Sequence, residues 1–212
     1  MTSISMDEIK ANYIASMGSE LGSCFYELYY KVTELHIFWQ QYRQLFGTDS
    51  ETVELLNRTA SLFFKVVQDQ LWDSVLLGIS RLTDPPKTGK NKNLTLRSLP
   101  GLIPEESLRT EVEALCEKAV AEAEFARQHR NKRIAHQDHE YLLNREASTL
   151  AGISRQRIEA ILKACSAVMN HIDGRYRDTT VMYHKFVDGS GARLLAHKLR
   201  VFEKLKSESK KP

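Results

Sequence analysis

The sequence predicts an all-α fold, built as an up-and-down bundle of four to five main helices. Only five prolines occur in 212 residues, and four of them lie between residues 85 and 104. Long proline-free stretches on either side carry apolar residues every three or four positions, which is the spacing of one helical face. These two observations favour helices throughout, separated by one short proline-containing break.

Two long helices are predicted in the first half of the chain. The first covers about residues 19–46 and ends at Gly47, and the second begins near Asp49 or Ser50, either of which can cap it. The second ends at residues 83–86, TDPP, because proline disfavours helix in the residue before it and cannot continue the hydrogen-bond ladder. The short link predicts an antiparallel pair. Four aromatic side chains on these helices are expected in the core rather than as base-stacking platforms: Trp39, Phe63, Phe64 and Trp72.

The next segment, residues 84–101, is predicted to be a loop with one helical turn at 94–99. After Asp84 it carries several basic residues and no acid. It is either a solvated connection or part of a basic approach to a functional site.

Three more helices complete the expected fold. One begins near Pro104 and leads into residues 127–140, and the next is capped by Ser154. An amphipathic helix then covers about residues 191–207, before a tail that we expect to be disordered. Residues 179–192 are ambiguous and could form a loop or a short strand.

The composition is that of an ordinary globular protein of a reducing compartment. A net charge of +3 is too small to indicate nucleic-acid binding by itself. Three distant cysteines argue against a disulfide framework and a zinc site, and there is neither a signal sequence nor an apolar run that could span a membrane. We therefore expect a cytoplasmic, soluble chain without a cofactor, with a helical-bundle domain over residues 1–180 and a C-terminal extension over residues 181–212.

Residues 127–140, RQHRNKRIAHQDHE, concentrate cationic and imidazole side chains. The stretch holds three of the seven histidines and four basic residues, with no acid before Asp138. Histidine can accept and donate a proton near neutral pH, and arginine binds phosphate through two parallel donors. Together they suffice for RNA cleavage without a metal, because an imidazole can deprotonate a ribose 2′-hydroxyl while a guanidinium stabilises charge on the phosphorus oxygens.

The motif RNKRIAH, residues 130–136, resembles the Arg-polar-x-x-x-x-His signature of HEPN domains. The likeness to the AbiU-like abortive-infection branch of that superfamily extends over about residues 25–175. The segments that carry it, besides the motif and the AHQD that completes it, are residues 39–47, 55–85 and 93–99.

The resemblance implies a dimerising helical bundle in which both motifs meet at the two-fold axis. It also implies a metal-independent endoribonuclease that leaves a 2′,3′-cyclic phosphate, acting as a toxin or phage-defence effector. Carried over to this chain, Arg130 and His136 are catalytic and Asn131 orients them. Since the family includes inactive members, the alternative is a non-catalytic module that binds RNA, a nucleotide or a nucleotidyltransferase antitoxin. The complete motif favours the enzyme, and a purely structural protein would leave the cluster unexplained.

Neighbouring residues are candidates for binding or supporting roles. Candidates for contacting RNA are Arg127, Lys132, Arg133 and His139. Candidates for supporting the catalytic groups are Arg81, Asp84 and Asp138, although Arg81 and Asp84 could instead form a plain ion pair at a helix end. His136 and His139 could suggest a zinc pair, but further ligands are missing, so no metal is expected.

The spacing of the motif predicts a site shared between two subunits. On one straight helix Arg130 and His136 would lie about 120° apart around the axis and about 9 Å apart along it. Either the helix breaks near Arg130 or the catalytic groups converge from two chains, and an isologous dimer interface achieves the second arrangement. We therefore expect a homodimer that acts on RNA, with an antitoxin protein as a further partner and no contact with membranes.

Overall fold

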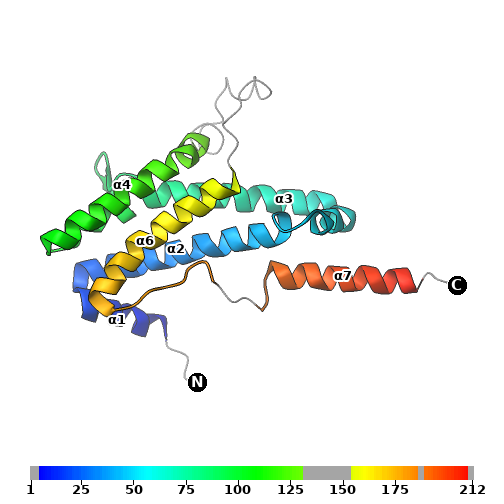
Figure 1. The fold of residues 1–212 in the computed structure, drawn as a ribbon, viewed down its shortest axis with the longest axis horizontal. Coiled ribbons are helices and arrows are strands. Elements are labelled where there is room, and N and C mark those ends of the chain that lie inside the picture. Colours follow the sequence, from blue (N-terminus) through cyan, green and yellow to red (C-terminus); the bar gives the residue numbers. More distant parts are fainter. Residues whose placement is uncertain (1–4, 131–153, 186–188, 210–212) are drawn as a thin grey trace. The chain divides into compact units, whose positions relative to one another are not determined.

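The computed structural model describes residues 5–130, 154–185 and 189–209, and it confirms the predicted all-α helical bundle (Figure 1). The helices are α1 (Met6–Met17), α2 (Ser19–Phe46), α3 (Ser50–Thr83), α4 (Glu106–His129), α6 (Arg155–Arg177) and α7 (Ala192–Glu208). The connection between α3 and α4 contains a two-stranded hairpin, β1 (Lys87–Thr88) and β2 (Asn91–Lys92), and two short 3-10 helices, η1 (Leu96–Ser98) and η2 (Pro100–Leu102). None of the helices in these described ranges combines the length and apolarity that a bilayer crossing requires.

Capping contacts set the helix ends close to where the sequence predicts them. α2 ends immediately before Gly47, as expected. Of the two proposed caps of α3, Asp49 makes the contact, since its Oδ1 accepts a hydrogen bond from the N–H of Thr52 (2.6 Å). At the start of α6 the Oγ of Ser154 accepts from the N–H of Arg157 (3.3 Å). Side-chain acceptors of this kind satisfy the first N–H groups of a helix, which have no partner inside it.

Three features were not predicted from the sequence, namely α1, the hairpin and η2. α1 begins with a reciprocal capping box in which Ser5 and Glu8 each accept from the other's backbone N–H. The hairpin formed by β1 and β2 occupies part of the expected loop, while the expected helical turn is present as η1.

The C-terminal part of the chain also departs from expectation. α7 extends to Glu208, so the first residues of the tail that was expected to be disordered are helical, and residues 210–212 lie outside the described residues. The ambiguous segment before α7 contains no strand in its described parts, residues 179–185 and 189–191.

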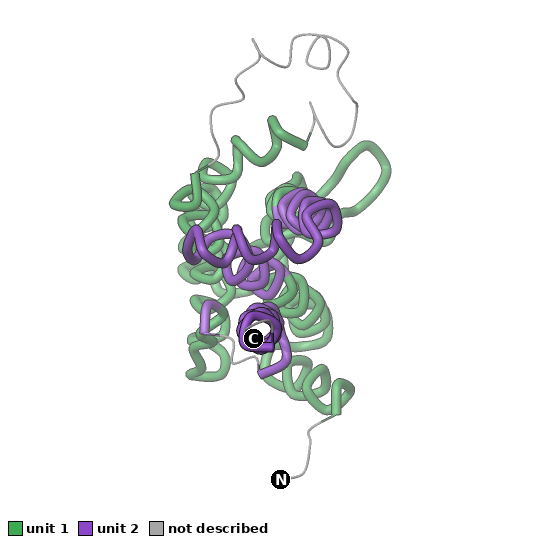
Figure 2. Tube along the Cα trace, turned by 90° about the vertical axis from the view of Figure 1, so that its right-hand side faces the viewer, with its two compact units in different colours: residues 1–34, 76–183 green, residues 35–75, 184–212 purple. Residues whose placement is uncertain are grey.

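Residues 1–34 and 76–183 form one compact unit (Figure 2). Within it α4 and α6 lie side by side and run antiparallel (Figure 1). The small side chains Ala119, Ala123 and Ala126 of α4 are almost completely buried, as are Ile158 and Ile161 of α6. Because alanine lets a neighbouring helix approach closely, this packing fixes the C-terminal end of α4 within the unit.

Residues 35–75 and 184–212 form a second compact unit (Figure 2). The rings of Trp39 on α2 and Trp72 on α3 lie 6.3 Å apart, so the two helices are in contact at this point. The prediction of a buried Phe63 is wrong, because this side chain is 60% exposed whereas Phe64 is buried. Consecutive residues point about 100° apart on a helix, so only one of the two can face the core. The core cluster of this unit comprises Leu45, Leu56, Phe64 and Ala192.

Candidate functional site

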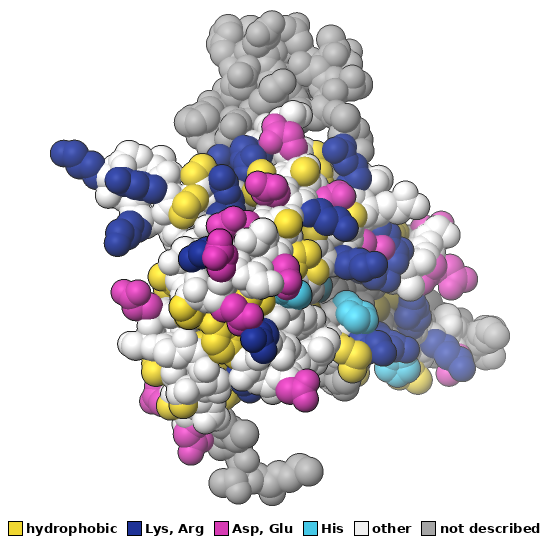
Figure 3. Space-filling view, turned by 60° about the vertical axis from the view of Figure 1, so that its left-hand side comes forward, with side chains coloured by type: hydrophobic (Ala, Val, Ile, Leu, Met, Phe, Trp, Pro, Cys, Tyr) yellow, Lys and Arg dark blue, Asp and Glu magenta, His cyan; other side chains and the backbone are white. Residues whose placement is uncertain are grey.

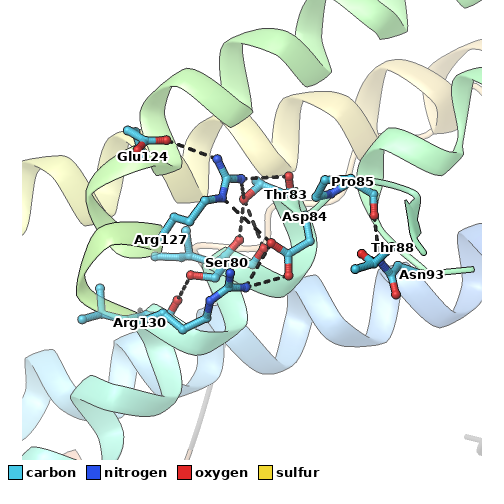
Figure 4. A network of polar contacts seen from close by, with 11 residues as sticks. Ser80, Thr83, Asp84, Pro85, Thr88, Asn93, Glu124, Arg127 and Arg130 are labelled. Atoms are coloured by element: carbon cyan, nitrogen blue, oxygen red, sulfur yellow. Dashed lines mark hydrogen bonds and ion pairs between the residues drawn. The ribbon is translucent and has the colours of Figure 1, made fainter. Parts of the chain in front are cut away.

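Two arginines at the C-terminal end of α4 contact the residues that end α3 (Figure 4). Nη1 of Arg130, the residue after α4, donates hydrogen bonds to both carboxylate oxygens of Asp84, at 3.0 Å and 2.7 Å. Nη2 of Arg127 donates to the backbone oxygen of Thr83 (3.1 Å), and its Nε lies 3.9 Å from Oδ1 of Asp84. Nη1 of Arg127 donates to Oε2 of Glu124 (3.2 Å). Asp84 is therefore the anion that both guanidinium groups face.

The chemistry of helix ends explains why these groups meet. α3 stops at Thr83, so its last carbonyl has no partner inside the helix, and Arg127 supplies the missing donor. A carboxylate such as Asp84 is unfavourable at the negative end of a helix dipole unless a cation offsets it. Arg130 provides that cation, and its own position at the C-terminal end of α4 is favourable for the same reason.

Arg130 continues the geometry of α4. Its φ of −54° and ψ of −50° are helical, and its N–H donates to the carbonyl oxygens of Ala126 and Arg127. The helix therefore shows no break up to this residue, and the direction of the Arg130 side chain follows from the packing of α4 in its unit.

The three central side chains are partly buried. The exposed fractions are 23% for Arg127, 22% for Arg130 and 24% for Asp84, whereas Glu124 is 55% exposed. Partial burial reduces screening by salt and strengthens the charge-assisted hydrogen bonds relative to a fully exposed pair. The residual exposure still lets an anion from solvent reach the two guanidinium groups, which are paired with Asp84 and Glu124.

The structure brings together three residues that the sequence proposed for the site, namely Arg127, Arg130 and Asp84. Arg81 is exposed on α3 and makes no ion pair with a described residue, so the Arg81–Asp84 pair considered from the sequence is not formed. The remaining candidates lie outside the described residues: Asn131, Lys132, Arg133, His136, Asp138 and His139.

The contact between Thr83 and Arg127 was not predicted from the sequence. Its side chain is buried, and its backbone oxygen holds Arg127 across 44 positions of the chain. The only sequence signal was the TDPP motif, which marks a helix end with an unpaired carbonyl but does not identify the donor.

A second polar cluster in the same unit lines a cavity of about 340 Å³ between α4 and α6. There Nε2 of His171 lies 2.7 Å from Oε2 of Glu111, and the hydrogen bond with His171 lowers the pKa of the Glu111 carboxyl. Arg175 is paired with both carboxylate oxygens of Glu105. The side chains of these two pairs are 40–58% exposed, so solvent screens their charges more strongly than it screens the Arg130–Asp84 pair.

No group of three or more His, Cys, Asp or Glu side chains within the described ranges could hold a metal ion. The cysteines are free, and burial raises the pKa of both Cys116 and Cys165 to about 12. At neutral pH these two are therefore thiols rather than the thiolates that bind metals or act as nucleophiles.

Comparison with known proteins agrees with the resemblance seen in the sequence. A HEPN family model described as AbiU2 matches residues 19–194, which contain Arg127, Arg130 and Asp84. No curated protein and no solved structure is significantly similar to the chain.

Proposed function

Because the chain belongs to the AbiU2 family of HEPN domains, we propose that it is a metal-independent endoribonuclease that cuts RNA at a site shared by two subunits. It would act in the cytoplasm as a toxin or phage-defence effector. The observation that carries the proposal is the placement of Arg130, the first residue of the RNKRIAH motif, in a partly buried ion pair with Asp84.

The proposed reaction needs no metal or external cofactor. An imidazole of His136 takes the proton from a ribose 2′-hydroxyl, whose oxygen attacks the adjacent phosphorus. The bond from phosphorus to the 5′-oxygen breaks, the imidazolium of the second subunit's copy of His136 protonates that oxygen, and a 2′,3′-cyclic phosphate remains. Two copies of one histidine thus act as base and acid, while Asn131 orients the catalytic groups.

Arg130 has the properties that charge stabilisation requires. Negative charge gathers on the non-bridging phosphate oxygens in the transition state, and a preorganised guanidinium stabilises it most when little reorganisation is needed. The two hydrogen bonds that Arg130 donates to Asp84, together with its helical backbone, restrict Arg130 before substrate arrives. Asp84 is therefore proposed as a positioning residue that acts through Arg130.

The binding roles proposed for the surrounding residues follow from their charge. Arg127, whose guanidinium already faces the site, would contact RNA phosphates together with Lys132, Arg133 and His139. Asp138 would support the histidines, as a carboxylate near an imidazole commonly does. An antitoxin protein such as a nucleotidyltransferase is proposed as the partner that restrains the activity.

The test is RNA cleavage by the purified full chain in excess chelator. We expect cleavage products ending in 2′,3′-cyclic phosphate, with losses of about 10²–10⁴-fold for His136→Ala and for Arg130→Ala. Lys118→Ala, an exposed lysine on α4, is the control and should cut like the native protein. Intact RNA after incubation with native protein, or equal cutting by the two motif variants, would reject the nuclease. RNA binding without cutting would instead favour the non-catalytic module.

A further inference from the structure

The hairpin β1–β2 stands clear of the helices immediately after the site residue Asp84 (Figure 2). It carries Lys87, Lys90 and Lys92, and Lys and Arg side chains gather on this projection (Figure 3). All three lysines are exposed, and none of their side chains forms a hydrogen bond or an ion pair with any residue of the described ranges. Their charges are therefore available to a ligand.

The hairpin is a defined structure rather than a solvated loop. Lys87 pairs with Lys92 and Thr88 with Asn91 across the two strands, and Gly89 begins the two-residue turn with a φ of 59°. A positive φ at the first central position is the requirement of a type II′ turn, and glycine meets it without strain. The backbone positions of the lysines are thus defined on both strands and at the tip.

Asn93 attaches the base of the hairpin to the end of α3. Its Nδ2 donates hydrogen bonds to the backbone oxygen of Pro85 (2.9 Å) and to Oγ1 of Thr88 (2.8 Å), and its backbone N–H donates to the oxygen of Pro86 (2.9 Å). These contacts tie the strands to the two prolines that follow Asp84 (Figure 4). The orientation of the hairpin is therefore coupled to the position of the arginine site.

The positive charges of the hairpin do not stabilise it. Lys87 and Lys92 are directly opposite each other, and like charges in that position destabilise a strand pair. The segment between them contains no acid to compensate and no apolar side chain to bury. The same absence of apolar residues disfavours insertion into a membrane surface, which requires an apolar face. A cluster of exposed lysines without acidic or apolar neighbours is suited to binding an extended polyanion.

We propose that Lys87, Lys90 and Lys92 bind the phosphate backbone of RNA on the approach to the Arg130–Asp84 site. The inference rests on the proposed ribonuclease function and names the surface that captures the substrate. Only two residues separate Asp84 from Lys87, so their Cα atoms lie at most about 11 Å apart along an extended chain. Lysine contacts to phosphate orient a strand without reading its sequence, so the hairpin contributes affinity and register.

The experiment uses the full chain and an RNA with 2′-O-methyl groups, which lacks the attacking hydroxyl and cannot be cut by this chemistry. Binding is measured by fluorescence anisotropy over a series of salt concentrations for native protein and for the triple variant Lys87→Gln, Lys90→Gln, Lys92→Gln. We expect roughly tenfold weaker binding at low salt, and a slope of log affinity against log salt that is shallower by about 0.7 for each lost phosphate contact.

The matched control changes three other exposed lysines of the same unit to glutamine, Lys31, Lys118 and Lys163. This control alters net charge equally and should leave binding almost unchanged. The hairpin variant should also keep the native kcat on a dinucleotide substrate, while its KM for long RNA rises.

Native affinity in the hairpin variant, or an equal loss in the control, would overturn the role of the hairpin while leaving the nuclease proposal intact. A native protein that neither binds nor cuts RNA would overturn both.

Discussion

At the residue scale, Asp84 is the group on which the candidate site depends. Its carboxylate accepts two hydrogen bonds from Arg130 and faces Arg127, although a helix end disfavours an acid there. The two guanidinium groups supply the positive charge that offsets the unfavourable placement of an acid at this helix end. Replacing the carboxylate of Asp84 by an amide of the same shape removes the charge and so tests what the ion pairs contribute.

For Asp84→Asn we expect a loss of about 10–100-fold in kcat for RNA cleavage with a smaller change in KM. Arg130 keeps its charge in this variant but loses the ion pair that positions its side chain. Stability should fall by about 1 kcal/mol, since the ion pair is only partly buried. Glu113→Gln, which removes an exposed carboxylate of α4 in the same way, is the matched control and should behave like native protein. Steady-state kinetics on a defined RNA measure both parameters, and an unchanged or increased kcat would contradict the positioning role.

Asp173 of α6 is a buried acid whose environment has a measurable consequence for stability. Its side chain is 1% exposed, its oxygens accept no hydrogen bond from the described residues, and its closest cation is Arg177 at 3.5 Å. Burial raises the pKa of the Asp173 carboxyl, and the nearby Arg177 only partly offsets that increase. The folded state therefore holds this proton more tightly than the unfolded state does.

The sign of the pH effect follows from that difference. As pH rises from about 3.8 through the raised pKa, the folded state loses the stability that protonation of Asp173 provides. Asp173→Asn abolishes this titration, so its free energy of unfolding at pH 7 should exceed the native value, and the difference should shrink toward pH 4. Urea denaturation between pH 4 and pH 7 measures it. A less stable variant at pH 7 would mean that the Arg177 interaction dominates burial.

At the element scale, the helices were predictable and the long-range contacts were not. The bounds of α2 and the start of α6 follow from apolar spacing and from caps such as Ser154, all of which are local signals. The hairpin was missed because its strands have two residues each and show no apolar alternation, so Gly89 was the only cue.

The same distinction between local signals and long-range contacts holds for the candidate site. Arg130 was identifiable from its motif, and Asp84 from its spacing of three residues from Arg81. Their pairing spans 46 positions, which no helical period encodes, whereas the local Arg81–Asp84 pair was the choice that spacing suggested. The packing of α4 within its unit makes Arg130, and not Arg81, the partner of Asp84.

The hairpin's attachment through Asn93 makes a prediction of its own. Asn93→Ala removes the two side-chain hydrogen bonds at the base but none of the lysine charges. We expect faster hydrogen exchange across residues 87–92, with a change of melting temperature of no more than about 2 °C, because the hairpin buries little apolar surface. Asn91→Ala, an exposed asparagine on the tip side, is the control. Equal exchange in the two variants would show that the side chain of Asn93 does not hold the hairpin.

At the scale of the whole molecule, the charge distribution matters more than the net charge. Thirty basic and twenty-seven acidic residues leave only +3, so long-range attraction to a polyanion is weak. Attraction must then arise locally, where the hairpin and the arginines at the end of α4 concentrate cations. Binding that depends on such a local cluster should be strongly sensitive to salt and insensitive to distant charge changes.

The proposed shared site can be tested by mixing native and inactive subunits. If one site needs both copies of His136, a mixed dimer of a native chain and a His136→Ala chain has lost either its base or its acid and should be as inactive as the His136→Ala dimer. Random assembly of the two chains in equal amounts makes a quarter of the dimers fully native, so the mixture should keep about a quarter of the native activity. A mixed dimer of native and Lys118→Ala chains, isolated in the same way by two affinity tags, is the control and should keep the full activity. An isolated native and His136→Ala mixed dimer that keeps about half of the native activity would place a complete site within each chain.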